Sequence, residues 1–305
     1  MLGQACALGA AFLWSTSVIL FKRSEAFRPQ AMNLFKNVAA LSLLLLTLPI
    51  LGQGFDWDRP VGDWWLLILS GVLGIAVADT LVFMALRRLG ASLLAVVDCC
   101  YSPVIVTFGV VVLGEQLSAS FVVGGLCVVG GVLVATTERI GRGAAEEDAT
   151  TEPADQAASR RSRVIGVLLG MTGIVVMALS IVIAKPLLER DNLVEVTTIR
   201  LIGGVGGHLL WLALVPSQRT ILTVFIPSAT WKTLLPASVL GSYVAMLLWL
   251  GGFKWTTAST ASVLNQMSTV FTIVLAAIFL GERISLRRGV GAAAAVGGAL
   301  LVMLR

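Results

Sequence analysis

The most constraining feature of this sequence is an internal repeat. Residues 72–133 align with residues 239–300 at a constant offset of 167 without a gap, and 19 of the 62 aligned positions are identical. A chain this apolar would give roughly 6 identities by chance. Both copies are strongly hydrophobic. The chain is therefore expected to fold as two related halves, each built from the same kind of element.

The composition predicts a membrane protein. Hydrophobic residues make up 57% of the chain and charged residues only 13%, about half the charged fraction of a typical soluble domain. Ten apolar stretches are long enough to cross a bilayer as helices, because a span needs about 20 residues and its backbone must pair within itself. These stretches cover residues 4–21, 31–51, 64–86, 90–113, 118–138, 164–186, 194–215, 232–253, 257–281 and 286–304.

The predicted fold is an all-α membrane protein with ten transmembrane helices, arranged as two inverted five-helix repeats. The first repeat covers residues 1–138 and the second covers residues 164–305. Residues 139–163 are polar and rich in Ala, Glu and Ser, so they are interpreted as a disordered linker. Because five is an odd number, the second copy enters the membrane from the opposite side, as in many secondary transporters.

The distribution of Lys and Arg predicts the orientation. Fifteen lie in the odd-numbered connections between helices, including the linker, and five lie in the even-numbered connections and the C-terminus. The positive-inside rule therefore places the linker in the cytoplasm of a bacterial-type inner (plasma) membrane and both termini outside. The net charge of +5 resides in the loops and favours contact with anionic lipids over nucleic acid.

Ionisable residues inside predicted spans are costly in lipid and are therefore functional candidates. Lys36, Asp79 and Asp98 lie roughly 8, 10 and 12 Å from the same membrane face at 1.5 Å per residue. Such a cluster either carries protons, with Asp98 and Asp79 as coupling carboxylates, or neutralises itself and holds helices together. Lys36 and Arg200 occupy related positions in the second helix of each half and are interpreted as charge partners.

The same region of each half offers polar and aromatic residues suited to a small-molecule pocket. In the repeat alignment Asp98 corresponds to Asn265. The two halves therefore share residues that pack, but they differ in charge at this position. Packing against lipid or core remains the alternative for each aromatic residue. The predicted substrate-binding residues are Trp14, Ser17, Asp79, Asp98, Tyr101, Tyr243, Trp249, Asn265 and Gln266.

Motifs of catalysis and ATP use are absent from the sequence. It contains one histidine, and no HExxH, GxxxxGK[ST] or GxSxG pattern occurs. We therefore expect a protein that is not an enzyme and has no metal or cofactor. The expected partners are a small-molecule substrate and membrane lipids, with a monomer or a homodimer as the assembly.

Two sequence segments resemble the two copies of the EamA repeat of the drug/metabolite transporter superfamily. They are residues 101–135 and 268–303, each with a Leu-Gly-Glu element (113–115 and 280–282) followed by a Gly-rich helix. Trp14 and Lys22 also match the family's first helix. Val270 departs from the pattern, which has a proline there.

The resemblance implies a ten-helix inverted-repeat carrier whose helices 3, 4, 8 and 9 line a central cavity. It also implies cytoplasmic termini, against the charge bias, so the absolute orientation stays open. The leading hypothesis is a secondary active transporter that exports small metabolites such as amino acids by alternating access and is coupled to protons. A lipid or lipid-linked sugar flippase and a non-transporting membrane scaffold are the alternatives.

Overall fold

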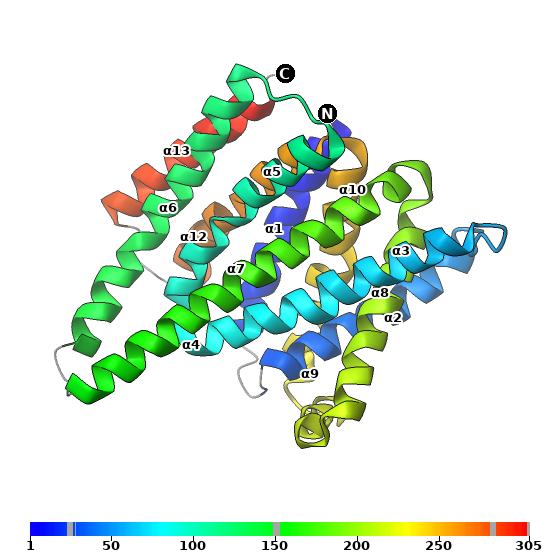
Figure 1. The fold of residues 1–305 in the computed structure, drawn as a ribbon, viewed down its shortest axis with the longest axis horizontal. Helices are drawn as coiled ribbons and strands as arrows, with labels where there is room; N and C mark the ends of the chain where they lie inside the picture. Colours follow the sequence, from blue (N-terminus) through cyan, green and yellow to red (C-terminus); the bar gives the residue numbers. More distant parts are fainter. Residues whose placement is uncertain (23–26, 28, 149–152, 281–284, 304–305) are drawn as a thin grey trace.

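The computed structural model describes all residues except 23–26, 28, 149–152, 281–284 and 304–305, and within these described residues it is helical with no strand (Figure 1). Ten of the described helical segments are long and apolar enough to cross a membrane, which confirms the all-α, ten-span prediction. They are Leu2–Phe21, Gln30–Ile50, Val61–Leu86, Val96–Leu113, Ala119–Thr136, Arg161–Arg190, Leu193–Leu214, Trp231–Trp255, Ala258–Phe279 and Leu286–Met303.

Several spans are composed of more than one helical element. In chain order the elements are α1 (Leu2–Lys22), α2 (Pro29–Ile50), α3 (Val61–Gly71), η1 (Val72–Ala78), α4 (Asp79–Asp98), α5 (Tyr101–Leu113), α6 (Ala119–Asp148), α7 (Pro153–Arg190), α8 (Leu193–Leu214), η2 (Pro216–Phe225), α9 (Trp231–Ser238), η3 (Val239–Val244), α10 (Ala245–Trp255), α11 (Ala258–Asn265), α12 (Met267–Leu280) and α13 (Leu286–Met303).

The two ends of the molecule differ in what they carry. Both chain termini lie at the same edge of the bundle (Figure 1). Because the spans alternate in direction, the connections 51–60, 114–118, 191–192 and 256–257 lie at this edge, which we call the terminal face. The opposite end, where α6 ends and α7 begins, is called the linker face.

Irregular helical turns occur at matching places in the two repeats. The π-helices η1 and η3 begin at Val72 and Val239, which are related by the offset of 167. A second break separates α4 from α5 at residues 99–100, and its counterpart separates α11 from α12 at Gln266. Single π turns and interrupted spans gather at functional sites in membrane carriers. The break at Gln266 forms without the missing proline at Val270.

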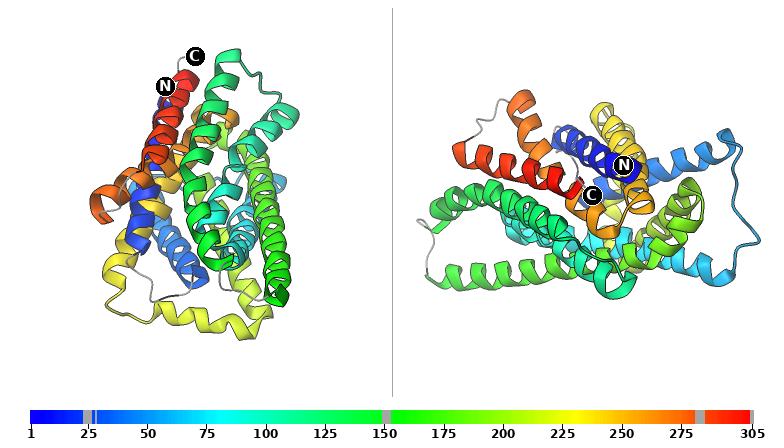
Figure 2. Two further views of the ribbon diagram at one scale, coloured as in Figure 1. Left: turned by 90° about the vertical axis from the view of Figure 1, so that its left-hand side faces the viewer. Right: turned by 90° about the horizontal axis from the view of Figure 1, so that it is seen from above.

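Close contacts between the repeats are reciprocal. A Cβ on Gly131 would lie 2.5 Å from the carbonyl oxygen of Gly291, and a Cβ on Gly298 would lie 2.5 Å from that of Gly124. The offset exchanges these two contacts, since it relates Gly124 to Gly291 and Gly131 to Gly298. α6 and α13 therefore run antiparallel along a seam of glycines (Figure 2).

A second reciprocal contact joins each π-helix to the first span of the other repeat. The Ser180 hydroxyl of α7 donates to the Ser70 carbonyl at 2.8 Å, and the Ser17 hydroxyl of α1 donates to the Ala237 carbonyl at 2.7 Å. Ser70 and Ala237 are again 167 residues apart. In both places the serine faces a glycine of the π-helix, Gly74 or Gly241, and a Cβ there would collide with the hydroxyl.

The segment expected to be a disordered linker is largely helical in the structure. α6 continues to Asp148 and α7 begins at Pro153, whereas residues 149–152 lie outside the described part. The Ala- and Glu-rich composition explains the difference, because these residues have high intrinsic helix propensity and extend helices that the membrane has already nucleated.

The glycine pairs of α7 and α8 pack within the chain. Gly170 faces Val97, and a Cβ on Gly203 would collide with the backbone of Ile68. Small residues here let α7 and α8 approach α3 and α4 closely. These glycines are therefore occupied by intramolecular contacts, and the oligomeric state stays a prediction.

Candidate functional site

A cavity of about 250 Å³ lies where the two repeats meet, and both π-helices and both broken spans contribute to its wall. Its lining is mostly apolar, with a small number of polar groups, as is usual for small-molecule sites. It is lined by Ala10, Ala11, Trp14, Lys36, Gly74, Ile75, Asp79, Asp98, Tyr101, Met177, Thr197, Arg200, Leu201, Gly241, Ala245, Met246, Trp249, Leu250, Asn265, Gln266 and Ser268.

One side of the cavity carries a paired charge. The Lys36 ammonium of α2 lies 3.8 Å from a carboxylate oxygen of Asp79, at the start of α4. The same ammonium lies 5.5 Å from the centroid of the Trp14 ring, a cation–π distance. Lys36 and Asp79 therefore form part of the charge cluster expected from their similar depths.

Asp98 differs from Asp79 because it has no ion-pair partner among the residues that the structure describes. It is the last residue of α4, directly before the helix break, and its side chain is exposed because it faces the cavity. Across the break, Gln266 donates hydrogen bonds from Nε2 to the carbonyls of Asp98 at 3.2 Å and Cys99 at 3.4 Å. Gln266 therefore satisfies carbonyls that the interrupted helix leaves open.

Arg200 brings an uncompensated positive charge to the wall of the same cavity. It is only 2% exposed, and its Nη2 donates to the Ser180 hydroxyl at 3.0 Å. Its Nε and Nη1 groups are buried without a hydrogen-bond partner, and no carboxylate pairs with it among the described residues. Buried guanidinium groups are normally paired, so Arg200 stands out as a buried cation of the cavity wall without a counter-charge among the described residues.

Two further polar groups in the wall have hydrogen-bonding capacity left over among the described residues. Both amide atoms of Asn265 are buried there without a partner, and the buried Tyr101 hydroxyl interacts with the Trp249 side chain. Tyr101 lies within electrostatic reach of both Asp98 and Arg200. The structure therefore gathers an anion, a cation, a hydroxyl and an amide around one cavity, all with hydrogen-bonding capacity to spare.

Seven of the nine predicted substrate-binding residues line this cavity, as do the two charge partners; their roles stay predictions. Ser17 and Tyr243 lie elsewhere. The Ser17 hydroxyl bonds to the Ala237 carbonyl, and the Tyr243 hydroxyl lies 2.6 Å from that of Thr47. Their hydroxyls are engaged in contacts between helices, and neither residue lines the cavity.

Sequence reasoning missed several lining residues, among them Met177, Thr197 and Ser268. Thr197 precedes Arg200 by three residues and so shares its helix face, which is a signal that was available in the sequence. Met177 gives no such signal, because it lies in a continuously apolar span.

The terminal face above the cavity is tightly cross-connected. Gly114 has a positive φ of 67°, which a residue with a side chain rarely adopts, and it turns the chain at the end of α5. The next residue, Glu115, accepts hydrogen bonds from Ala258 N at 2.5 Å, Ser259 N at 3.0 Å and the Ser259 hydroxyl at 2.5 Å. The Leu-Gly-Glu element therefore caps the first turn of α11.

Comparisons with known proteins agree with this architecture. A model of the "EamA-like transporter family" matches residues 1–137 and 164–304. A solved structure described only as "Crystal structure of protein" superposes with a TM-score of 0.80, at 19% sequence identity, over 99% of this chain and 96% of that chain, which supports the fold alone. No curated protein matches the sequence.

The family match covers nearly the whole length of both repeats, and the ten spans agree with the fold of that family. The resemblance to the EamA repeat found in the sequence is therefore confirmed. The chain belongs to the EamA-like transporter family and is an integral membrane transporter of the drug/metabolite transporter superfamily.

Proposed function

We propose that this protein is a secondary active transporter that exports small metabolites such as amino acids across a bacterial-type inner membrane. The two five-span repeats are inverted, and they expose the central cavity alternately to the two compartments. The reciprocal glycine and serine contacts support the inversion, because a two-fold axis in the membrane plane produces such exchanged pairs. The linker face is cytoplasmic in this proposal, in line with the positive-inside rule.

The observation that carries the proposal is the pair of uncompensated charges in the cavity. Arg200 offers buried guanidinium donors, and Asp98 offers a carboxylate that faces the same space. An amino acid compensates both, because its carboxylate pairs with the guanidinium and its ammonium pairs with Asp98. The remaining wall is mainly apolar, which favours an apolar side chain on the substrate.

Proton coupling is assigned to the acidic residues of the cavity. The ammonium group of the substrate competes with a proton for the Asp98 carboxylate, so binding of one releases the other. Asp79 is the second candidate, although Lys36 at 3.8 Å favours its charged form.

Counterflow in proteoliposomes tests the substrate class. Vesicles loaded with unlabelled amino acid should take up the labelled amino acid faster than empty vesicles. Arg200→Gln should raise the half-saturating concentration at least tenfold, because it removes a charge-assisted bidentate contact. Arg219→Gln is the matched control, since Arg219 is exposed on η2. Equal counterflow by wild type and Arg200→Gln would contradict the assignment, and inhibition by lipid headgroups in place of amino acids would favour a flippase.

A further inference from the structure

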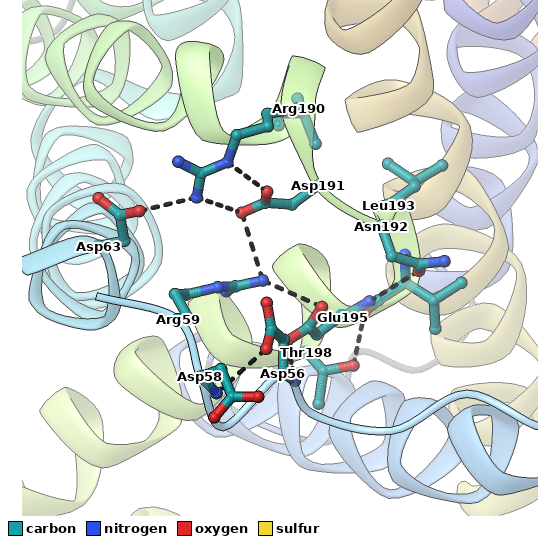
Figure 3. A network of polar contacts seen from close by, with 12 residues as sticks. Asp56, Asp58, Arg59, Asp63, Arg190, Asp191, Asn192, Leu193, Glu195 and Thr198 are labelled. Carbon is teal, nitrogen blue, oxygen red and sulfur yellow. Dashed lines mark hydrogen bonds and ion pairs between the residues drawn. The ribbon is translucent and has the colours of Figure 1, made fainter. Parts of the chain in front are cut away.

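A network of ion pairs joins the two repeats at the terminal face (Figure 3). Arg59, in the connection between α2 and α3, points its guanidinium Nη2 at Asp191 Oδ2, 3.3 Å away, and at Glu195 Oε2, 3.0 Å away. The other oxygen of Glu195 accepts a hydrogen bond from Asp56 N at 2.9 Å. The network therefore connects the loop of the first repeat to the turn between α7 and α8 in the second.

Neighbouring charges extend this connection. Arg190 donates to Asp63 at 2.7 Å and to Asp191 at 2.6 Å, so it ties the first turn of α3 to the last turn of α7. Lys254, at the end of α10, donates to the carbonyl of Asp191 at 2.7 Å. Three separate parts of the terminal face therefore converge on the short turn that follows α7.

The central member of the network is buried. The Arg59 side chain is only 1% exposed, and its guanidinium carbon lies 5.5 Å from the centroid of the Trp64 ring. Its Nε and Nη1 groups are buried, and neither has a hydrogen-bond partner in the part of the chain that the structure describes. Burying a guanidinium is costly, and well-packed apolar residues of similar size stabilise a protein as well or better. Stability alone therefore does not account for this arrangement.

At the linker face, the described residues of the corresponding region pack as an apolar cluster. Carried back beyond the aligned repeat, which begins at residue 72, the offset of 167 places Ile226 on Arg59 and Thr230 on Asp63. Near these positions α2, α8, η2 and α9 close over an apolar cluster that includes Phe35, Ile221 and Val224. Equivalent places in the two repeats therefore use ion pairs at the terminal face and apolar packing at the linker face.

We propose that the Arg59–Asp191–Glu195 network is an ionic gate of the terminal face, which holds this mouth closed and separates when the cavity opens to that side. The proposal rests on alternating access, because only a moving carrier needs this contact to break. Closure through charges gives a contact that water can replace on opening, since each separated group regains its hydration. An apolar contact at the same place would resist opening into water.

A reversible bridge across the gate tests the proposal. The variant Arg59→Cys/Asp191→Cys is made in a cysteine-free background. Its two thiols are then joined by a bifunctional thiol reagent whose spacer contains a cleavable disulfide. Bridging should reduce flux in proteoliposomes at least tenfold, and reductant should restore it. If the bridged protein transports at the unbridged rate, the mouth does not separate there and the gate is refuted. Absence of flux from the unmodified protein would instead count against the proposed transport function.

A measurement without substrate keeps the gate testable if the double variant folds poorly. In the cysteine-free protein, Met177→Cys introduces a single thiol in the cavity wall. A membrane-impermeant thiol reagent is added at the terminal face, and the rate at which it modifies this thiol is measured. Arg59→Gln should increase the modification rate at least tenfold, whereas Arg59→Lys should increase it less because it keeps the charge. Arg219→Gln is the control and should leave the rate unchanged. Equal rates for Arg59→Gln and its parent, in protein of unchanged thermal stability, would overturn the proposal.

Discussion

Replacing Glu115 with Gln should measurably weaken the connection between the repeats. The Glu115 carboxylate accepts three hydrogen bonds at the start of α11, from Ala258 N, Ser259 N and the Ser259 hydroxyl. A Gln side chain has the same length, but it keeps only one oxygen and carries no charge. At least one backbone N–H therefore loses its charged acceptor, and the Ser259 hydroxyl must turn to meet an amide donor.

The magnitude follows from these contacts. Loss of one charge-assisted hydrogen bond costs about 1.5–3 kcal/mol, and loss of the negative charge at the helix N-terminus costs about 0.3–1 kcal/mol. Reorientation of the hydroxyl recovers part of this. We expect Glu115→Gln to lower the free energy of unfolding by about 2 kcal/mol, and Glu115→Ala by about 3 kcal/mol because no acceptor remains.

Thermal unfolding in detergent is the assay. A loss of about 2 kcal/mol corresponds to a fall in Tm of roughly 3 °C for a chain of this size. Asp58→Asn is the matched control, because Asp58 is exposed on the same face and changes the net charge by the same amount. A Glu115→Gln variant that unfolds together with the wild type would refute the capping role assigned to this glutamate.

Three further outcomes are expected. Asp98→Asn should abolish flux driven by a pH gradient in proteoliposomes, and unchanged gradient-driven flux would remove Asp98 as the coupling residue. Arg190 lowers the pKa of Asp191 by hydrogen bonding. The stabilisation from this pair should therefore be complete above the unfolded pKa of about 4 and be lost as the pH falls through the lower folded pKa. Asp191→Asn should flatten the acid limb of a plot of Tm against pH, and an unaltered acid limb would contradict this prediction. Gly131→Leu should lower the free energy of unfolding by about 3 kcal/mol, because the new side chain overpacks the contact between α6 and α13. Gly130→Leu is the control and should change Tm little, because the space around Gly130 is open. Equal changes in Tm for the two variants would argue against a close contact at Gly131.

The sequence was sufficient to predict the ten spans because hydrophobic length is a direct physical requirement of the bilayer. It also indicated which ionisable residues would lie near the cavity, since Asp79, Asp98 and Arg200 are costly in lipid and need a polar surrounding. Helical periodicity alone did not settle orientation around each helix. Ser17 lies one turn from Trp14 and yet bonds to another helix, because the π turn at Gly241 brings that backbone within reach.

The ionic gate was not predictable from sequence. Arg59, Asp191 and Glu195 are charged residues near loops, and such residues are usually solvated. Only the fold shows that a ten-residue connection brings the Arg59 guanidinium onto the ring of Trp64 and close to two carboxylates. The capping role of Glu115 was hidden for the same reason, because its partner Ser259 is distant in sequence and the repeat motif alone says nothing of what the carboxylate contacts.

The most direct test of the account is whether the cavity is reached from both compartments. In a cysteine-free protein reconstituted with known orientation, a single cysteine at Ser268, in the cavity wall, is treated with an impermeant thiol reagent from one side at a time. Alternating access predicts modification from each side, with a side preference that reverses when the proton gradient is reversed. Modification from only one side under every gradient, or from neither side, would contradict the claim that this cavity is the transport site.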